Sequence, residues 1–218
     1  MIRTGSYKEF KDSLLKTYSI SWDCGKDANY HGQCYPILAP KKEFWRTYKD
    51  NIGKISEEDN YRYYIEEYYK QVLSLLDPAK VYGELDYSIL LCYEDNLEFC
   101  HRHIVSAWFE LLLGVKVPEV KFKNNRLMVV ERPEYIKEYL EDAIRKNKNM
   151  RGFTSLRALY IFEKSEELER EADELEESGK FFEDYRAAAA FMRSDADMEE
   201  ARYHSGRKKK IRKYECSN

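Results

Sequence analysis

The order of apolar and polar positions between residues 88 and 114 predicts a buried strand that leads into a helix. Residues 89–92 form a short, unbroken run of apolar side chains, which is typical of a strand buried on both faces. The apolar side chains that follow recur every fourth residue, at Cys100, Ile104, Trp108 and Leu112. This is the period of an amphipathic helix, and Gly114 stands where a helix-ending glycine is expected.

Between these two elements, Asp95 and Glu98 have the spacing of a capping box, which predicts that the helix opens at Asp95. The carboxyl end of the strand would then lie next to the helix N-terminus. In open α/β sheets, ligands bind in the crevice outside the carboxyl ends of the strands. A carboxylate, a thiol, an imidazole and a guanidinium would meet in this crevice, on Glu94, Cys100, His101 and Arg102.

Shorter patterns in the first part of the chain predict the rest of a layered α/β fold. Strands are predicted where residues favour β-structure or where apolar and polar residues alternate. These segments are residues 1–4, 17–22, 117–122 and 127–130. Helical periods cover residues 41–51 and 56–76. Residues 23–40 are rich in Gly, Asn, Asp and Pro and predict a long loop. We therefore expect a small Rossmann-like sheet with the 88–94 strand at its centre and helices on both faces.

Beyond this body, only helical patterns occur. Pro133 suits the first turn of a helix, and a long charged helix is expected from Thr154 to about Ser178. We therefore divide the chain into an α/β domain over residues 1–132 and an all-helical extension over residues 133–218. The extension has a narrow apolar seam, which indicates packing within the chain or in a homodimer, and it carries a basic tail at residues 207–213.

Composition narrows the class of protein. The 218 residues are 35% charged and 15% aromatic, with 19 tyrosines, as in a folded protein. A net charge of -3 argues against a uniformly basic protein that coats nucleic acid, but it is compatible with a local basic patch. No apolar run is long enough for a membrane span, and the N-terminus lacks the apolar segment of a signal peptide. With five cysteines, an odd number, we expect a cytoplasmic protein with free thiols.

Several short motifs resemble those of the DUF488 family over about residues 1–120. They include Thr4-x-Ser6-Tyr7, residues 18–21 and 35–40, and above all Cys92-x-Glu94 followed, after five intervening residues, by Cys100-His101-Arg102. The family consists of small bacterial and archaeal domains of largely uncharacterised function. The resemblance implies a compact, usually cytoplasmic α/β domain with Rossmann-like layers and no assigned cofactor. Cys24, His31 and Cys34 depart from the family pattern.

Arg102 is the candidate anion-binding residue. A guanidinium in the opening turns of a helix, beside free backbone N–H groups, suits a phosphate or carboxylate. This points to a phosphate-bearing ligand, such as a nucleotide or a nucleic-acid base. Alternatively, Arg102 pairs with Glu94 or Glu98 and only ties the strand to the helix.

Glu94 and His101 are candidate acid–base residues, and Cys100 is a candidate nucleophile because a helix N-terminus lowers a thiol pKa. The opposing interpretation is that Cys100 begins the apolar stripe and is simply buried, which its periodicity favours. Of the many aromatic residues, we assign Trp22, Tyr35 and Tyr48 to ligand binding, although such side chains more often pack in the core.

The 23–40 loop also contains possible metal ligands. Cys24, His31 and Cys34 could bind zinc together with one of Cys92, Cys100 or His101. The spacing matches no standard zinc motif, so we expect no metal and no cofactor. The residues thus leave two main functions open: an enzyme that uses Glu94 and His101, or a non-catalytic module for ligand or protein binding in which the Cys-His-Arg motif is structural.

Overall fold

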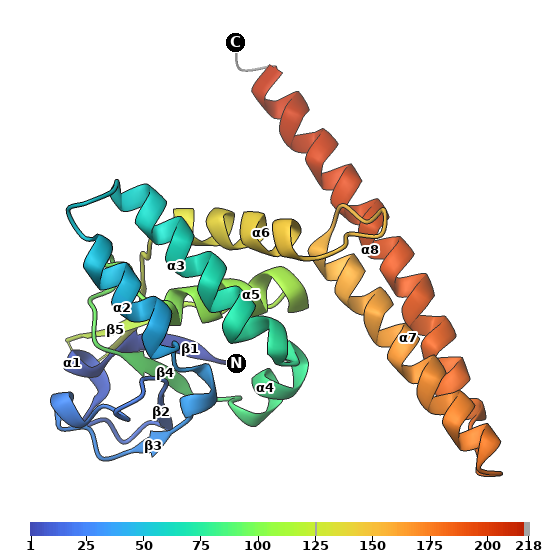
Figure 1. The fold of residues 1–218 in the computed structure, drawn as a ribbon, viewed down its shortest axis with the longest axis horizontal. Coiled ribbons are helices and arrows are strands. Elements are labelled where there is room, and N and C mark those ends of the chain that lie inside the picture. The colour runs from blue at the N-terminus through green and yellow to red at the C-terminus, as the bar shows by residue number, and fades with distance from the viewer. Residues whose placement is uncertain (125, 216–218) are drawn as a thin grey trace. The chain divides into compact units, whose positions relative to one another are not determined.

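The computed structural model describes residues 1–124 and 126–215, with side chains described up to residue 206. The chain forms two compact units, one over Met1–Lys148 and the other from Asn149 onward. The first unit is the α/β body, and the second is a helical hairpin (Figure 1). Among the described residues, no helix is long and apolar enough to cross a membrane.

The first unit is built on a six-stranded mixed sheet with the order β3-β2-β4-β1-β5-β6. The five strands β3, β2, β4, β1 and β5 run parallel to one another, whereas β6 runs antiparallel to β5. The strands are β1 Arg3–Ser6, β2 Thr17–Ser19, β3 Gln33–Cys34, β4 Ile89–Cys92, β5 Glu119–Lys123 and β6 Arg126–Val130. The prediction of an α/β fold with this strand at the centre of the sheet is confirmed.

β4 lies in the middle of the sheet, and all four of its side chains are buried there. Ile89 and Leu91 face a core cluster with Tyr7 and Phe10, which belong to the short helix α1, Tyr7–Phe10. By strand alternation, Cys92 faces the opposite side of the sheet, toward His101 at the start of α5. The parallel register places the carboxyl ends of β1, β2 and β4 at one edge of the sheet.

The helices of the first unit connect the strands and cover the sheet (Figure 1). They are α2 Lys42–Asn51, α3 Glu57–Gln71, α4 Pro78–Glu84, α5 His101–Leu113 and α6 Tyr135–Asn147, with 3-10 turns at Lys26–Ala28, Pro36–Leu38 and Leu73–Leu75. Ser56 caps α3 by accepting a hydrogen bond from the Asp59 N–H at 3.1 Å.

The start of α5 differs from the prediction. Residues 93–100 form turns, and the helix begins at His101 with Cys100 as the N-cap residue. The pairing of Asp95 with Glu98 does form, since the Asp95 N–H donates to Glu98 Oε2 at 2.7 Å, but it closes a turn and not a helix. Gly114 ends the helix with a positive φ of 68°, as expected.

The first unit also includes α6, so the predicted boundary at residue 132 falls inside it. The apolar face of α6 is buried through Ile136, Leu140 and Ile144, and the helix packs against α3 and α5. Sequence periodicity marked the change from strands to helices, but it could not show on which surface this helix packs.

The second unit pairs α7, Leu156–Glu177, with α8, Glu183–Glu215 (Figure 1). Small side chains, Ala172 on α7 and Ala189 and Ala196 on α8, are fully buried between the helices and allow their close approach. The predicted all-helical character beyond Pro133 is confirmed for the described residues. The predicted basic tail at residues 207–213 lies outside the side chains that the structure describes.

Candidate functional site

A cleft of about 680 Å³ opens at the carboxyl end of β4. Its floor is formed by Cys92, Glu94, Cys100 and His101, and its walls come from α2, α3 and the segment after β2. The wall and rim residues are Ser21, Trp22, Asp23, Asp27, Pro40, Trp45, Tyr48, Lys49, Tyr61, Tyr64, Tyr93, Glu98 and Phe99. The structure therefore brings all three predicted catalytic residues, Glu94, Cys100 and His101, into one cleft.

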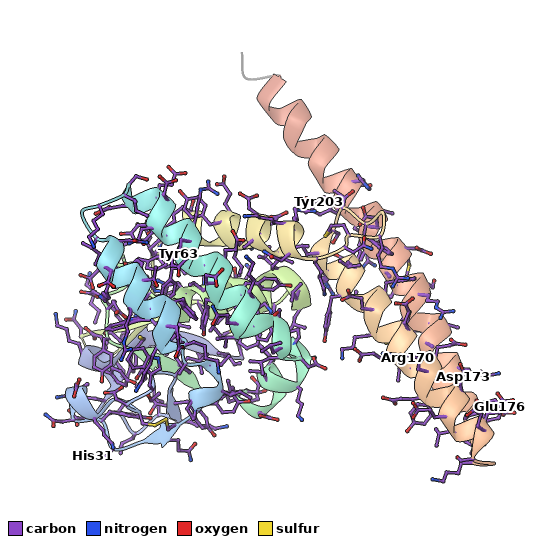
Figure 2. All side chains as sticks on the ribbon, in the orientation of Figure 1. His31, Tyr63, Arg170, Asp173, Glu176 and Tyr203 are labelled. Atoms are coloured by element: carbon purple, nitrogen blue, oxygen red, sulfur yellow. A yellow bond between two sulfur atoms is a disulfide. The ribbon has the colours of Figure 1, made fainter. Side chains whose placement is uncertain are left out.

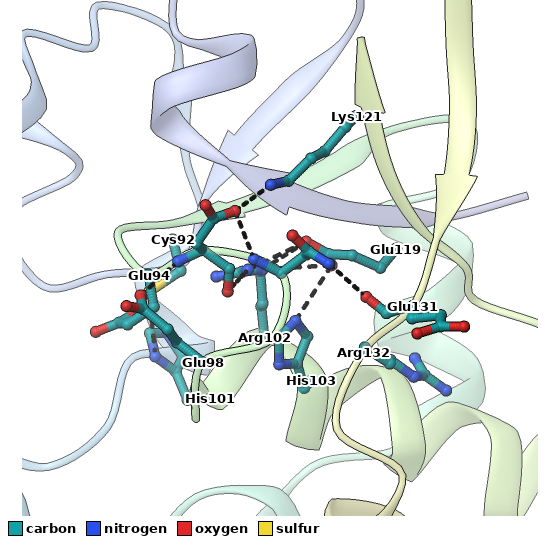
Figure 3. Close-up of polar contacts among 12 residues, drawn as sticks. Cys92, Glu94, Glu98, His101, Arg102, His103, Glu119, Lys121, Glu131 and Arg132 are labelled. Carbon is teal, nitrogen blue, oxygen red and sulfur yellow. Dashed lines mark hydrogen bonds and ion pairs between the residues drawn. The ribbon is translucent and has the colours of Figure 1, made fainter. Parts of the chain in front are cut away.

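The floor side chains lie within contact distance of one another. Cys92 Sγ is 3.2 Å from Glu94 Oε2 and 3.4 Å from His101 Nδ1. Cys100 Sγ lies within 4.8 Å of Cys92 Sγ and of a ring nitrogen of His101. Figure 3 shows Cys92, Glu94 and His101 together on one side of Arg102. This arrangement gathers two thiols, an imidazole and a carboxylate.

The orientation of His101 is fixed by the backbone of the neighbouring strand segment. Its Nε2 lies 3.0 Å from the carbonyl oxygen of Ile20. Because a carbonyl oxygen only accepts hydrogen bonds, Nε2 must carry the proton and donate. Nδ1 is therefore the nitrogen that faces Cys92 and the cleft floor.

The charges on the floor depend on its burial. Burial, together with the charge and hydrogen bond of Cys100, raises the pKa of Glu94 to about 7. Burial and Cys100 also raise the pKa of Cys92. Burial opposes ionisation of Cys100 too, but the Cys92 hydrogen bond, the Arg102 charge and the bond to His101 lower the pKa of the Cys100 thiol. The Cys100 hydrogen bond in turn raises the pKa of His101 against the effect of burial.

Arg102, the candidate anion-binding residue, does not line the cleft. Its side chain is 0% exposed and forms an ion pair with Glu119 of β5, which is 1% exposed. Arg102 Nη2 and Nε lie 3.1 and 3.2 Å from Glu119 Oε1, and Nη2 also donates to the Asp95 carbonyl at 2.9 Å. The predicted structural alternative, pairing with Glu94 or Glu98, named the wrong partner.

The buried pair is part of a small polar core on the far side of Arg102 from the cleft floor (Figure 3). His103 Nε2 lies 3.4 Å from Glu119 Oε2. Although burial raises the pKa of Glu119, its contacts with His103 and Arg102 lower it below the usual range. Glu119 is thus held as a carboxylate that ties β5 to α5.

The walls of the cleft are aromatic. Trp22 meets Trp45 edge-to-face, with ring centroids 4.9 Å apart, and Tyr61 stacks on Phe99 at 4.3 Å with an interplanar angle of 16°. The ring centroid of Tyr48 lies 5.6 Å from that of Phe99, and Tyr48 also lines the cleft. Such walls suit a planar apolar or heteroaromatic ligand.

Two of the three predicted ligand-binding aromatic residues, Trp22 and Tyr48, line the cleft, but Tyr35 does not. The Tyr35 hydroxyl instead donates to Glu84 Oε2 at 2.5 Å, and its ring packs on Tyr18 with centroids 6.2 Å apart. Tyr35 therefore lies outside the cleft, because the turn after β3 directs its side chain toward α4.

The cysteines of the 23–40 loop do not form a metal site. Cys24 and Cys34 form a disulfide bond, which contradicts the expectation of free thiols throughout. His31 is exposed and lies at the periphery of the first unit (Figure 2). Cys92 and Cys100 are free and buried, as predicted, and the fifth cysteine, Cys216, lies outside the described residues.

Fold and site together define an α/β protein with a candidate site at the carboxyl end of its central strand. Residues 3–112, half of the chain, match the sequence model described as the active DUF488-N3 subclade. The chain belongs to the DUF488 family, which confirms the resemblance. Comparisons with curated proteins and with solved structures found no match.

Several cleft residues were not singled out from the sequence. Trp45 and Tyr61 belong to the general aromatic enrichment of the chain, and Phe99 directly precedes the Cys100-His101-Arg102 motif. No sequence motif marks Lys49. The only sequence signal for Trp45, Lys49 and Tyr61 is their helical spacing on α2 and α3, and this spacing does not reveal which helix face meets the cleft. Phe99 lies in the segment just before α5. Glu119, the partner of Arg102, carried no signal because β5 lies 17 residues further along the chain.

Proposed function

We propose that the cleft binds the heterocyclic base of a nucleoside or nucleotide and that the side chains on its floor act chemically on this ligand. The observation that carries the proposal is the combination of aromatic walls with a carboxylate, two sulfur atoms and an imidazole on one floor. A volume of about 680 Å³ suits a small molecule of this size.

The walls support recognition of a planar ring. A base that enters between the Trp22/Trp45 pair and the Tyr61/Phe99 stack would bury both of its faces against aromatic carbon. Stacking of a base on an aromatic side chain contributes about 1–3 kcal/mol and tolerates different bases. This supports the class of ligand without selecting a particular base.

The charges support a base inside the cleft and a phosphate, where present, at its rim. Asp23, Asp27, Glu94 and Glu98 line the cleft, and Lys49 is the only lysine or arginine among its described lining residues. Lys49 Nζ lies 5.5 Å from the Trp45 ring centroid and Lys42 Nζ lies 5.6 Å from that of Trp22. The two lysines, and not the buried Arg102, are therefore the groups suited to a phosphate.

Glu94 is the best placed residue for proton transfer. It follows β4, lines the cleft and contacts Cys92 on the floor. His101 is held by Ile20 and can fix the geometry of the floor, and Cys100 places a sulfur atom beside it. Acid–base chemistry on a bound heterocycle is the reaction class that this arrangement supports best.

Ligand binding is tested by calorimetry and by quenching of tryptophan fluorescence with a panel of bases, nucleosides and nucleotides. Tyr61→Ala should weaken binding by about 1–3 kcal/mol because it removes one stacking surface. Tyr63→Ala is the matched control, since Tyr63 lies on the same helix but does not line the cleft. Lys49→Gln should weaken binding of nucleotides more than binding of nucleosides.

Chemistry is tested with whichever panel compound binds. Glu94→Gln should retain binding while product formation, followed by chromatography, falls by at least about 100-fold. Binding without any product in the wild type would favour the non-catalytic module. Absence of binding across the panel, with a Tyr61→Ala variant indistinguishable from wild type, would refute the proposal for the cleft.

A further inference from the structure

We propose that Cys92, Cys100 and His101 bind a zinc ion on the floor of the cleft. This inference goes beyond the proposed ligand and does not depend on it. It also differs from the metal set weighed from the sequence, because Cys24 and Cys34 are bonded to each other and are unavailable as ligands. Two thiolates and one imidazole form a donor set that zinc prefers.

The ligand atoms already lie near the separations that zinc requires. For Zn–S bonds of about 2.3 Å and Zn–N bonds of about 2.0–2.1 Å, tetrahedral geometry separates sulfur from nitrogen by about 3.6 Å and two sulfurs by about 3.8 Å. Cys92 Sγ is 3.4 Å from His101 Nδ1, and one ligand atom from each of the three residues lies within 4.8 Å of the others. Small side-chain adjustments are enough to close the site.

His101 is oriented as a metal ligand should be. Its Nε2–H donates to the Ile20 carbonyl, so Nδ1 is the nitrogen that can present a lone pair to the floor. A histidine that binds a metal through one nitrogen commonly donates its other N–H to a carbonyl or carboxylate, which fixes the ring. The bond also directs Nδ1 toward the Cys92 sulfur atom, which lies 3.4 Å away.

The framework around the three residues is rigid and has a suitable charge. Cys92 is the last residue of the central strand, and Cys100 is the N-cap residue of α5, so both backbones are fixed by regular structure. Two thiolates neutralise a divalent cation, and all three side chains are buried, so water can approach the metal only from the cleft.

A fourth coordination position would face the cleft. The three protein ligands come from the floor, and Glu94 Oε2 lies 3.2 Å from Cys92 Sγ on the cleft side. Zinc sites with three protein ligands characteristically leave the fourth position to water or to a bound molecule. The position beside Glu94 is therefore where the metal would meet a ligand in the cleft.

The experiment uses the full-length protein with its disulfide intact and no nucleoside present. Elemental analysis of protein incubated with zinc and then desalted should give about one zinc per chain. Replacement by cobalt(II) should give the intense visible bands of a tetrahedral ion and a thiolate-to-cobalt charge-transfer band. Cys92→Ser and Cys100→Ser should each abolish this band or weaken it strongly, and His101→Gln should raise the Kd by at least about tenfold.

Matched controls separate this site from the other candidate ligands. The double variant Cys24→Ser/Cys34→Ser and the variant His31→Gln should each keep one metal per chain. Because a serine variant can fail to fold, wild-type protein provides a second readout: bound zinc should protect Cys92 and Cys100 from alkylation, as measured by mass spectrometry.

The inference is overturned if wild-type protein retains no zinc and gives no charge-transfer band with cobalt. It is also overturned if zinc leaves the alkylation of Cys92 and Cys100 unchanged. Since every readout is made without a nucleoside, failure of the metal site and failure of the proposed ligand are separate results.

Discussion

The ion pair between Arg102 and Glu119 allows a sharp prediction about stability. In Glu119→Gln, the guanidinium keeps its bond to the Asp95 carbonyl at 2.9 Å but loses its counter-charge. Water cannot replace that charge, since the two side chains are 0% and 1% exposed. Loss of one partner from a buried pair costs about 3–5 kcal/mol, and we expect Glu119→Gln to reduce the free energy of unfolding by this amount.

Urea unfolding followed by tryptophan fluorescence measures this loss of stability in the first unit, Met1–Lys148. The three tryptophans, Trp22, Trp45 and Trp108, all lie within Met1–Lys148, so the signal reports on the α/β body alone. Glu58→Gln is the matched control. Glu58 pairs with Arg62 at 3.1 Å, but the side chains are 61% and 38% exposed, so the cost should stay below about 1 kcal/mol.

The double variant Arg102→Met/Glu119→Leu refines the test. It removes both charges and leaves apolar side chains in their place, so it should be less destabilised than Glu119→Gln alone. A loss in Glu119→Gln no larger than that of the Glu58→Gln control would refute the structural role of the pair. The role of the pair would also be refuted if the stability loss of the double variant equalled the sum of the losses in the single variants Arg102→Met and Glu119→Leu.

The same pair predicts the direction of a pH dependence. Contacts with His103 and Arg102 hold the pKa of Glu119 below its usual range in the folded state. A carboxyl group with a lowered pKa contributes stability above its unfolded pKa of about 4.3 and loses it as the pH falls through the folded value. The stability difference between wild type and Glu119→Gln should therefore be full at pH 7 and shrink below about pH 4.

Two further predictions concern the disulfide and the extent of the first unit. Reduction, or the double variant Cys24→Ser/Cys34→Ser, should lower the stability by about 2–3 kcal/mol because it releases a cross-link across 10 residues; equal urea midpoints with and without reductant would contradict this. A fragment of residues 1–148 should unfold cooperatively, whereas a fragment of residues 1–132 should be several kcal/mol less stable because it lacks the buried α6 side chains Ile136, Leu140 and Ile144. Equal stability of the two fragments would place α6 outside the α/β body.

Local patterns determined the central part of this fold. The apolar run of β4, the four-residue period of α5 and the positive φ required at Gly114 each follow from a few neighbouring residues. The placement of Glu94, Cys100 and His101 at one edge of the sheet followed as well, because the carboxyl end of β4 leads directly to the N-terminus of α5.

Only the tertiary structure decided the partners of these residues. Arg102 looks identical in sequence whether its guanidinium faces solvent or Glu119, because a strand 17 residues away supplies the carboxylate. Cys24 reaches Cys34 because β3 pairs with β2, and Cys92 reaches His101 because β4 lies against α5. Tyr35 precedes a 3-10 turn and Tyr48 lies in α2, and neither local setting reveals that the first side chain faces α4 and the second the cleft. Contacts between distant segments depend on how whole elements pack, and local periodicity does not encode that packing.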